Sequence, residues 1–231
     1  MISRKNGNVS LLEKLIRLIY PAKCMVCDAV LNEDTYLYLC DPCKKNLPRC
    51  QKGFVKISQM PYLDGVFAAF YYREGIKSAI QSMKFKSYPR LAQTMGSLVC
   101  EELFKYNPIP DFDFLVPVPM HPKKKRQRGY NQAELVANEA AHILNKEVHT
   151  DILLKVRNTT AQSRLKREDR LKNLESAFMI NYSIIKNNRN KRVLLLDDVL
   201  TTGTTVNTCA KILKENGFSS VYALVIAIAE K

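Results

Sequence analysis

Val193-Leu-Leu-Leu-Asp-Asp-Val-Leu-Thr-Thr-Gly-Thr-Thr205 is the segment that decides the fold. It begins with a short apolar run, which is typical of a strand buried on both faces of a parallel sheet. Two carboxylates end this run, and a turn of small hydroxyl residues and one glycine then leads into an amphipathic stretch that reaches Asn216. We therefore expect a strand, a turn and a helix of an α/β domain, with the ligand beyond the carboxyl end of the strand.

The turn has the chemistry of an anion site. Its backbone N–H groups, its hydroxyls and the positive end of the following helix suit one phosphate group. The residues expected to hold this phosphate are Thr201, Thr202, Gly203, Thr204 and Thr205. Asp197 and Asp198 would repel a phosphate beside them, but they can accept hydrogen bonds from the 2′ and 3′ hydroxyls of a ribose. The pattern therefore predicts a site for a ribose 5-phosphate, whereas an ordinary helix cap needs neither the second carboxylate nor the run of threonines.

Strand and helix patterns alternate through most of the remaining chain. We expect strands at 66–72, 114–118, 193–196 and 221–227, and helices at 76–85, 90–104, 131–144 and 204–216. Two further short apolar runs, at 152–156 and 177–180, flank a long basic segment. The helix that ends at Asn216 is followed by Gly217, a suitable left-handed cap. This order predicts one α/β domain, a mostly parallel sheet with helices on both faces.

Two Cys-x-x-Cys pairs, Cys24 with Cys27 and Cys40 with Cys43, lie 12 residues apart near the N-terminus. Each pair brings two thiolates to one ion, so that two pairs complete the tetrahedron of a structural Zn²⁺ site. Buried free thiols or two disulfides are the alternatives, but a reduced cytosol disfavours disulfides and core cysteines need no paired spacing. Four protein ligands leave no open position for catalysis.

The N-terminal part of the chain is expected to be a small module of its own. Ser10 and Glu13 have the capping-box spacing that begins a helix, Pro21 ends it, and 51–61 has the polar composition of a linker. We therefore predict a helix and a zinc-ribbon-like four-cysteine module with its linker at 1–60 and the main domain at 61–231. Cys50 has no nearby partner and is expected to be a bystander.

The charge of the chain favours polyanionic partners. Lys and Arg exceed Asp and Glu by 36 to 22, a net charge of +14. Residues 111–192 hold 17 of the basic residues and 9 of the acidic ones. Such a surplus attracts nucleic acid or an anionic membrane, although a solvated surface has the same composition.

Two basic segments contain most of this charge, and we expect both to be loops. The first, 121–132, follows the strand at 114–118 and includes Arg128, so it can cradle a pyrophosphate at the carboxyl end of the sheet. The second, 157–178, includes Arg157 and Arg170 and has the composition of a lid that excludes water. For His121, a strand-end residue that bonds the backbone is favoured over a base.

Several classes of protein are excluded or disfavoured by pattern. No stretch reaches the roughly 18 apolar residues of a spanning helix, so an integral membrane protein is not expected and a cytoplasmic location is. The chain lacks the G-x-x-x-x-G-K-[ST] motif of nucleotide triphosphate loops and the G-x-G-x-x-G motif of dinucleotide-binding folds.

Residues 195–205 resemble the phosphoribosyl pyrophosphate signature of type I phosphoribosyltransferases. This resemblance implies that Asp197 and Asp198 contact the ribose, as the catalytic carboxylates if the protein is an enzyme, and that 201–205 hold the 5′-phosphate. The cysteine pairs and the two basic segments are in addition similar to motifs of the ComF (ComFC) family of competence proteins. The motif residues of the basic segments are His121, Arg128, Gly129, Tyr130, Asn131, Gln132, Arg157, Thr160, Gln162, Arg170, Asn173, Ala177 and Phe178.

The family resemblance implies a role in DNA uptake and natural transformation. It implies binding of phosphoribosyl pyrophosphate with Mg²⁺ and handling of single-stranded DNA, with a competence helicase or translocase as partner at the membrane-associated uptake machinery. An active phosphoribosyltransferase acting on an unidentified base or amine is the alternative, and a phosphoribosyl pyrophosphate sensor is a third. The sequence shows no acceptor motif that would decide between them.

Overall fold

The computed structural model describes Arg17 and residues 19–32, 34–85, 89–106, 108–158, 176–185 and 190–230. Its centre is a five-stranded sheet in which every neighbouring pair of strands is parallel. The strand order is β1 (Gly65–Tyr71), β7 (Ser220–Ile228), β6 (Arg192–Leu200), β2 (Phe114–Pro117) and β3 (Glu147–Val148). The predicted parallel sheet is confirmed, and the carboxyl ends of its strands lie along one edge.

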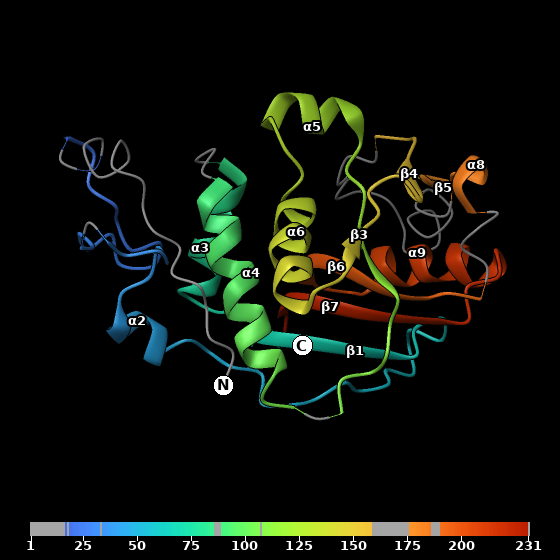
Figure 1. Cartoon of the computed structure of the whole chain (residues 1–231), viewed down its shortest axis with the longest axis horizontal. Helices are drawn as coiled ribbons and strands as arrows, with labels where there is room; N and C mark the ends of the chain where they lie inside the picture. The colour runs from blue at the N-terminus through green and yellow to red at the C-terminus, as the bar shows by residue number, and fades with distance from the viewer. Residues whose placement is uncertain are drawn as a thin grey trace.

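Helices cover both faces of the sheet (Figure 1). The helices of one face are α3 (Ile76–Phe85), α4 (Pro89–Leu103) and α6 (Gln132–Leu144), and α9 (Thr204–Glu215) covers the other. Strand β6 supplies both layers of the core, since Leu194 and Leu196 pack toward α4 and α6 while Val193 and Leu195 pack toward α9. The apolar run of this strand is thus explained by burial on two sides.

A second sheet has two antiparallel strands, β4 (Leu153–Lys155) and β5 (Phe178–Ile180), with the short helix α8 (Tyr182–Ile185) after it. Its inner residues Leu153, Phe178 and Ile180 join the same core layer as α9. The two short apolar runs at 152–156 and 177–180 thus form strands, and these strands stand outside the main sheet.

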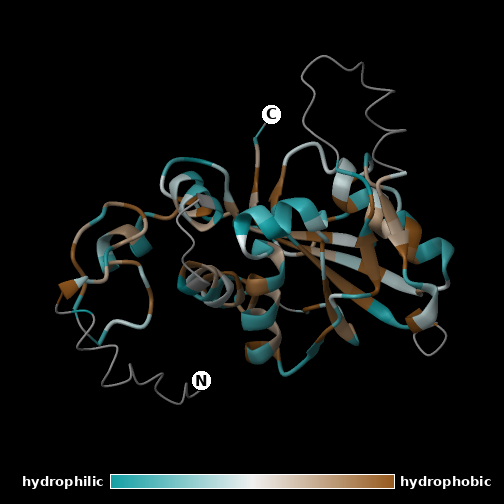
Figure 2. Cartoon of the chain, turned by 90° about the horizontal axis from the view of Figure 1, so that it is seen from above, coloured by the Kyte–Doolittle hydropathy of each residue, from teal (hydrophilic) through white to brown (hydrophobic). Residues whose placement is uncertain are grey.

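The first basic segment is not a loop, as we had expected, because Pro122–Arg128 forms the helix α5. His121 caps its N-terminus by accepting a hydrogen bond from the backbone N–H of Lys123, and Pro122 fits the first turn. Gly129 ends the helix in the left-handed conformation with a φ of 88°. Helix α5 stands away from the core, and its residues are hydrophilic (Figures 1 and 2).

The cysteine-containing segment packs against the main domain. The helix α2 (Asp41–Lys45) belongs to it, and the backbone N–H of Tyr38 donates to Thr94 Oγ1 on α4 at 3.0 Å. The expected linker lies along the sheet edge, where Val55 pairs with Val66 of β1 in an antiparallel bridge. This pairing covers the edge of the sheet. The boundary near residue 60 stays a prediction, and the helix expected to begin at Ser10 lies mostly outside the described residues.

Within the described residues, no helix combines the length and the apolar character needed to cross a membrane.

Candidate functional site

The four predicted zinc ligands come together. The Sγ atoms of Cys24, Cys27, Cys40 and Cys43 all lie within 4.8 Å of one another, and those of Cys27 and Cys40 are 3.7 Å apart. A tetrahedral Zn²⁺ with Zn–S bonds of about 2.3 Å separates its sulfur ligands by about 3.8 Å. The donor set and its spacing therefore fit a structural zinc ion.

The electrostatics of the cluster also favour a bound cation. Burial alone would raise the pKa of the Cys24 thiol, but the backbone N–H groups of Cys40, Cys27 and Val26 lower it to about 7. At Cys43, burial and then hydrogen bonds with the other thiols raise the pKa. The thiols therefore resist full ionisation together, and a divalent ion supplies the charge that stabilises four thiolates.

The three other cysteines lie elsewhere. Cys50 is buried on the far side of β1, where its thiol contacts the hydroxyl of Tyr71 and holds the pKa of that hydroxyl above its usual value. Cys100 and Cys209 are buried on α4 and α9. None of them joins the cluster, as expected.

The phosphoribosyl turn links β6 to α9. The strand extends past the predicted 196 to Leu200, because Asp197 and Val199 continue the ladder with β7. Gly203 then adopts a φ of 74° and precedes the first residue of α9. A Cβ at this position would lie 1.9 Å from Cε of Met60, so both the conformation and the space require glycine.

The turn leaves hydrogen-bond donors at the surface. Helix α9 begins without a side-chain cap, and Thr201 and Thr202 are exposed. The hydroxyls of Thr202 and Thr204 lie 2.9 Å apart. The N–H of Thr204 donates to Thr202 Oγ1 at 3.5 Å. The start of this 12-residue helix, together with the hydroxyls, has the chemistry expected of an anion site.

The two carboxylates lie at the carboxyl end of β6 and have different surroundings. The Oδ2 atom of Asp198 is 2.6 Å from Nζ of Lys84 on α3. Asp197 Oδ1 accepts the backbone N–H of Asp198 at 2.8 Å. Burial, and then the charge of Asp198, raise the pKa of Asp197 from 3.8 to about 7, although Lys84 and Lys155 act in the opposite direction. The site thus holds one carboxylate paired with a lysine and one acid whose pKa is raised to about 7.

Comparison with known proteins identifies the family. Residues 130–230, a range that includes the turn, match the family model described as a phosphoribosyl transferase domain. Competence protein ComFC of Streptococcus pneumoniae is 30% identical over 206 residues, covering 82% of this chain and 86% of the relative. The chain belongs to the ComF family of competence proteins.

One further relative agrees with this ComF assignment. Competence protein F of Haemophilus influenzae is 29% identical over 177 residues, covering 75% of this chain and 76% of the relative. A match to a crystal structure of adenine phosphoribosyltransferase covers 79% of this chain and 88% of that chain, with 13% identity and a TM-score of 0.40. The expected fold, a phosphoribosyltransferase-like sheet preceded by a zinc-ribbon-like module, is confirmed.

The Arg-Gly-Tyr-Asn-Gln motif of this ComF protein joins α5 to α6. Arg128 Nη1 donates to Gln132 Oε1 at 2.7 Å, and the Tyr130 hydroxyl donates to the backbone oxygen of Met83. Asn131 caps α6 and donates to the carbonyl of Val118 at 3.0 Å. The Nε2 group of Gln132 is buried and has no partner among the described residues. A buried amide in this state marks a place for a ligand or a water molecule.

The second basic segment is described only at its ends. Arg157 is exposed, and its Nη1 atom donates to Ser176 Oγ at 2.9 Å. The ComF motif residues Thr160, Gln162, Arg170 and Asn173 lie outside the described residues, and so does most of the expected lid. Ala177 and Phe178 are buried at the start of β5.

Two lysines of the candidate site were not predicted from the sequence. Lys84 stands on α3, and Lys155 ends β4, where burial and then the charge of Lys124 lower the pKa of its ammonium group. Lys155 acts electrostatically on Asp197 and Cys209, so it lies on the α9 side of β6. Neither lysine belongs to a motif, and only the fold brings them to residues 197 and 198.

Proposed function

We propose that this chain acts in DNA uptake during natural transformation and binds phosphoribosyl pyrophosphate, with Mg²⁺, through the turn after β6. The observation that carries the proposal is the juxtaposition of Asp197 and Asp198 with the uncapped start of α9. Membership of the ComF family supports the role in competence. The turn would take the 5′-phosphate and the two carboxylates the ribose diol.

The motif between α5 and α6 supports a pyrophosphate site beside this ribose site. Arg128 offers a guanidinium, and the partnerless Nε2 group of Gln132 offers a second donor. We assign Arg157 and Arg170 to the same ligand on the family motif. Mg²⁺ would neutralise the pyrophosphate oxygens, and cationic donors suit that ligand.

We further propose that the basic middle of the chain binds single-stranded DNA. Helix α5 has Lys123, Lys124, Lys125, Arg126 and Arg128 within seven residues and no acidic residue. Neutralised phosphates supply most of the affinity of sequence-independent binding. A cytoplasmic protein that meets a helicase or translocase at the uptake machinery would have this surface facing the incoming strand.

Thermal unfolding tests whether phosphoribosyl pyrophosphate binds to the protein. Phosphoribosyl pyrophosphate with Mg²⁺ should raise the melting temperature of the zinc-loaded protein, because a ligand that binds only the folded state stabilises it. Ribose 5-phosphate should do so less, since it lacks the pyrophosphate. An equal shift by ATP, or no shift by the diphosphate, would contradict the assignment.

Fluorescence anisotropy tests the DNA-binding surface. Affinity for a labelled single strand should fall steeply between roughly 50 and 200 mM salt, because bound lysines release counterions. Lys123→Gln with Arg126→Gln should weaken binding and flatten this dependence. Lys52→Gln with Lys56→Gln, which removes two exposed charges from the 51–61 segment, should leave it unchanged.

A working phosphoribosyltransferase is the second candidate. The placement of Lys84 and Lys155 beside the carboxylates favours it, since cations near a ribose site can stabilise the departing pyrophosphate. Release of pyrophosphate in the presence of a base or amine would establish transfer. Binding with no release across a broad set of acceptors would favour the sensor instead.

A further inference from the structure

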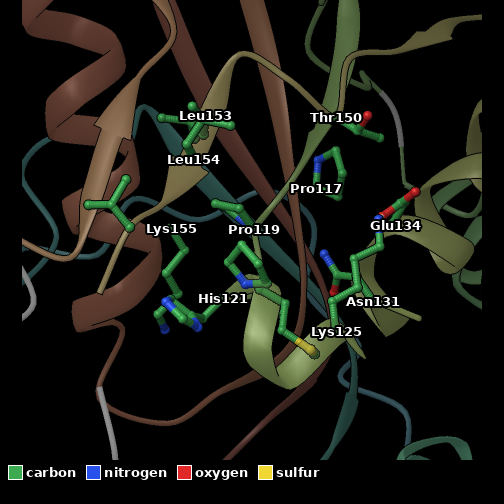
Figure 3. Close-up of a pocket in the computed structure, with 13 residues that line it drawn as sticks. Pro117, Pro119, His121, Lys125, Asn131, Glu134, Thr150, Leu153, Leu154 and Lys155 are labelled. Carbon is green, nitrogen blue, oxygen red and sulfur yellow. The ribbon is translucent and has the colours of Figure 1, made fainter. Parts of the chain in front are cut away.

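A pocket of about 340 Å³ lies between the chain that leaves β2 and strand β4 (Figure 3). One wall consists of Pro117 and Pro119, and the other of Leu153, Leu154 and Val156. These side chains are apolar. The volume is at the lower end of the range for small-molecule sites, and it is too small for a folded partner.

The polar residues that line the pocket are His121, Lys125, Asn131, Glu134, Thr150 and Lys155. Asn131 donates to the carbonyl of Val118 and accepts the backbone N–H of Ala133, so its side chain is held in the wall. Lys125 is held by Glu134 at 2.7 Å, whereas Lys155 borders both the pocket and the surroundings of Asp197. Apolar walls with a few polar groups at the edges suit a planar heterocycle, whose faces are apolar and whose edge forms hydrogen bonds.

The mouth of the pocket is next to the most basic helix of the described residues. Pro122 and Lys125 line the pocket and belong to α5, whose exposed Lys123 and Arg126 lie outside it. A heterocycle in the pocket would therefore have a chain of positive charges beside it. This combination fits a base attached to a phosphate backbone better than it fits a free base.

We infer that this pocket receives one unstacked nucleobase of a single DNA strand while α5 holds the adjoining phosphates. The inference rests on the proposed binding of single-stranded DNA, and it adds the position at which a base is held.

Two opposite residues of the β4–β5 sheet form a matched test. Leu154 and Met179 are directly paired and both are about half-exposed, at 41% and 50%, but only Leu154 lines the pocket. Leu154→Asp and Met179→Asp add the same charge to the same face of the sheet. Both variants should fold, which their zinc content and melting temperature would verify.

The experiment measures affinity by anisotropy for an oligothymidylate and for an abasic strand of equal length. Wild type and Met179→Asp should prefer the thymidylate by about tenfold, the contribution of a stacked base. Leu154→Asp should lose this preference while keeping its affinity for the abasic strand. Val156→Asp should behave like Leu154→Asp.

Other results would overturn the inference in distinguishable ways. If Leu154→Asp and Met179→Asp keep the same preference for bases, the pocket holds none, although strand binding stands. If wild type binds neither strand, the proposed DNA binding fails as well. If free thymidine monophosphate displaces the strand from wild type at equal concentration, the pocket is a site for a free nucleotide.

Discussion

Lys84 Nζ on α3 lies 2.6 Å from Asp198 Oδ2 at the end of β6, and both side chains are about three-quarters or more buried. The pair joins two segments that are more than 100 residues apart in the sequence. Because Lys84 also lowers the pKa of Asp197, it supports the charge of both carboxylates. The proposed ribose site thus depends on α3, a helix outside every recognised motif.

Replacement of this lysine should weaken the binding of phosphoribosyl pyrophosphate. In Lys84→Gln the pKa of Asp197 should rise further, and a rise by one unit from about 7 lowers the ionised fraction at pH 7 about fivefold. Calorimetry should show a loss of that order at pH 7 and a smaller loss at pH 9. Lys77→Gln, on the exposed side of α3, is the control. An unchanged affinity in Lys84→Gln would remove Lys84 from the site.

Asp197 should make stability depend on pH. Its pKa is about 7 in the folded chain and 3.8 ordinarily, so the folded state binds more protons between these values. Its contribution to stability is therefore present below about pH 4 and is lost as pH rises to 7. Asp197→Asn, which resembles the neutral acid, should raise the melting temperature relative to wild type more at pH 8 than at pH 5. An equal difference at both pH values would contradict the raised pKa.

The zinc module should hold one ion per chain. Cys27→Ser should lose the metal although Cys27 is the exposed member of the cluster, because three thiolates do not complete a structural site. Cys50→Ser should keep the metal, since Cys50 lies outside the cluster, on the far side of β1. Elemental analysis of the two purified variants gives the number of zinc ions per chain in each. Loss of zinc should also lower the melting temperature, because the segment packs on α4 through Tyr38 and Thr94.

Alanine substitutions at Gly203 and Gly129 should distinguish the cost of backbone strain from the cost of steric crowding. Both have a positive φ, but a Cβ at Gly129 meets nothing within 4 Å, whereas one at Gly203 meets Met60. Gly129→Ala should cost about 1–2 kcal/mol in urea unfolding. Gly203→Ala should cost about 1–3 kcal/mol more. Combined with Met60→Ala, its cost should be less than the sum of the two single losses, and strict additivity would show that Met60 is not the obstacle.

The strands could be predicted because 193–196 and 221–227 are apolar runs between turn signals. Their order in the sheet could not, since pairing of β6 with β2 and β7 depends on contacts distant in sequence. Helix α5 was missed because its lysines have no apolar periodicity. Its end signals, Pro122 and Gly129, were present and could have revealed it.

The candidate site could be proposed from the sequence where a single segment contains its residues. The turn at 197–205 and the cysteine pairs are local patterns, and their residue types and spacing indicate their chemistry. Lys155 was not predictable, because only the fold of β4 beside β6 brings its charge to Asp197.

Calorimetric titration of phosphoribosyl pyrophosphate with Mg²⁺ is the most direct test of the central claim. Wild type should show saturable binding to one site per chain, and Asp197→Asn with Asp198→Asn should abolish it. Glu147→Gln with Glu215→Gln, which removes two exposed carboxylates elsewhere, should bind like wild type. Absence of binding by folded, zinc-loaded wild type, or equal binding by the Asp197 and Asp198 double variant, would contradict the assignment of this turn.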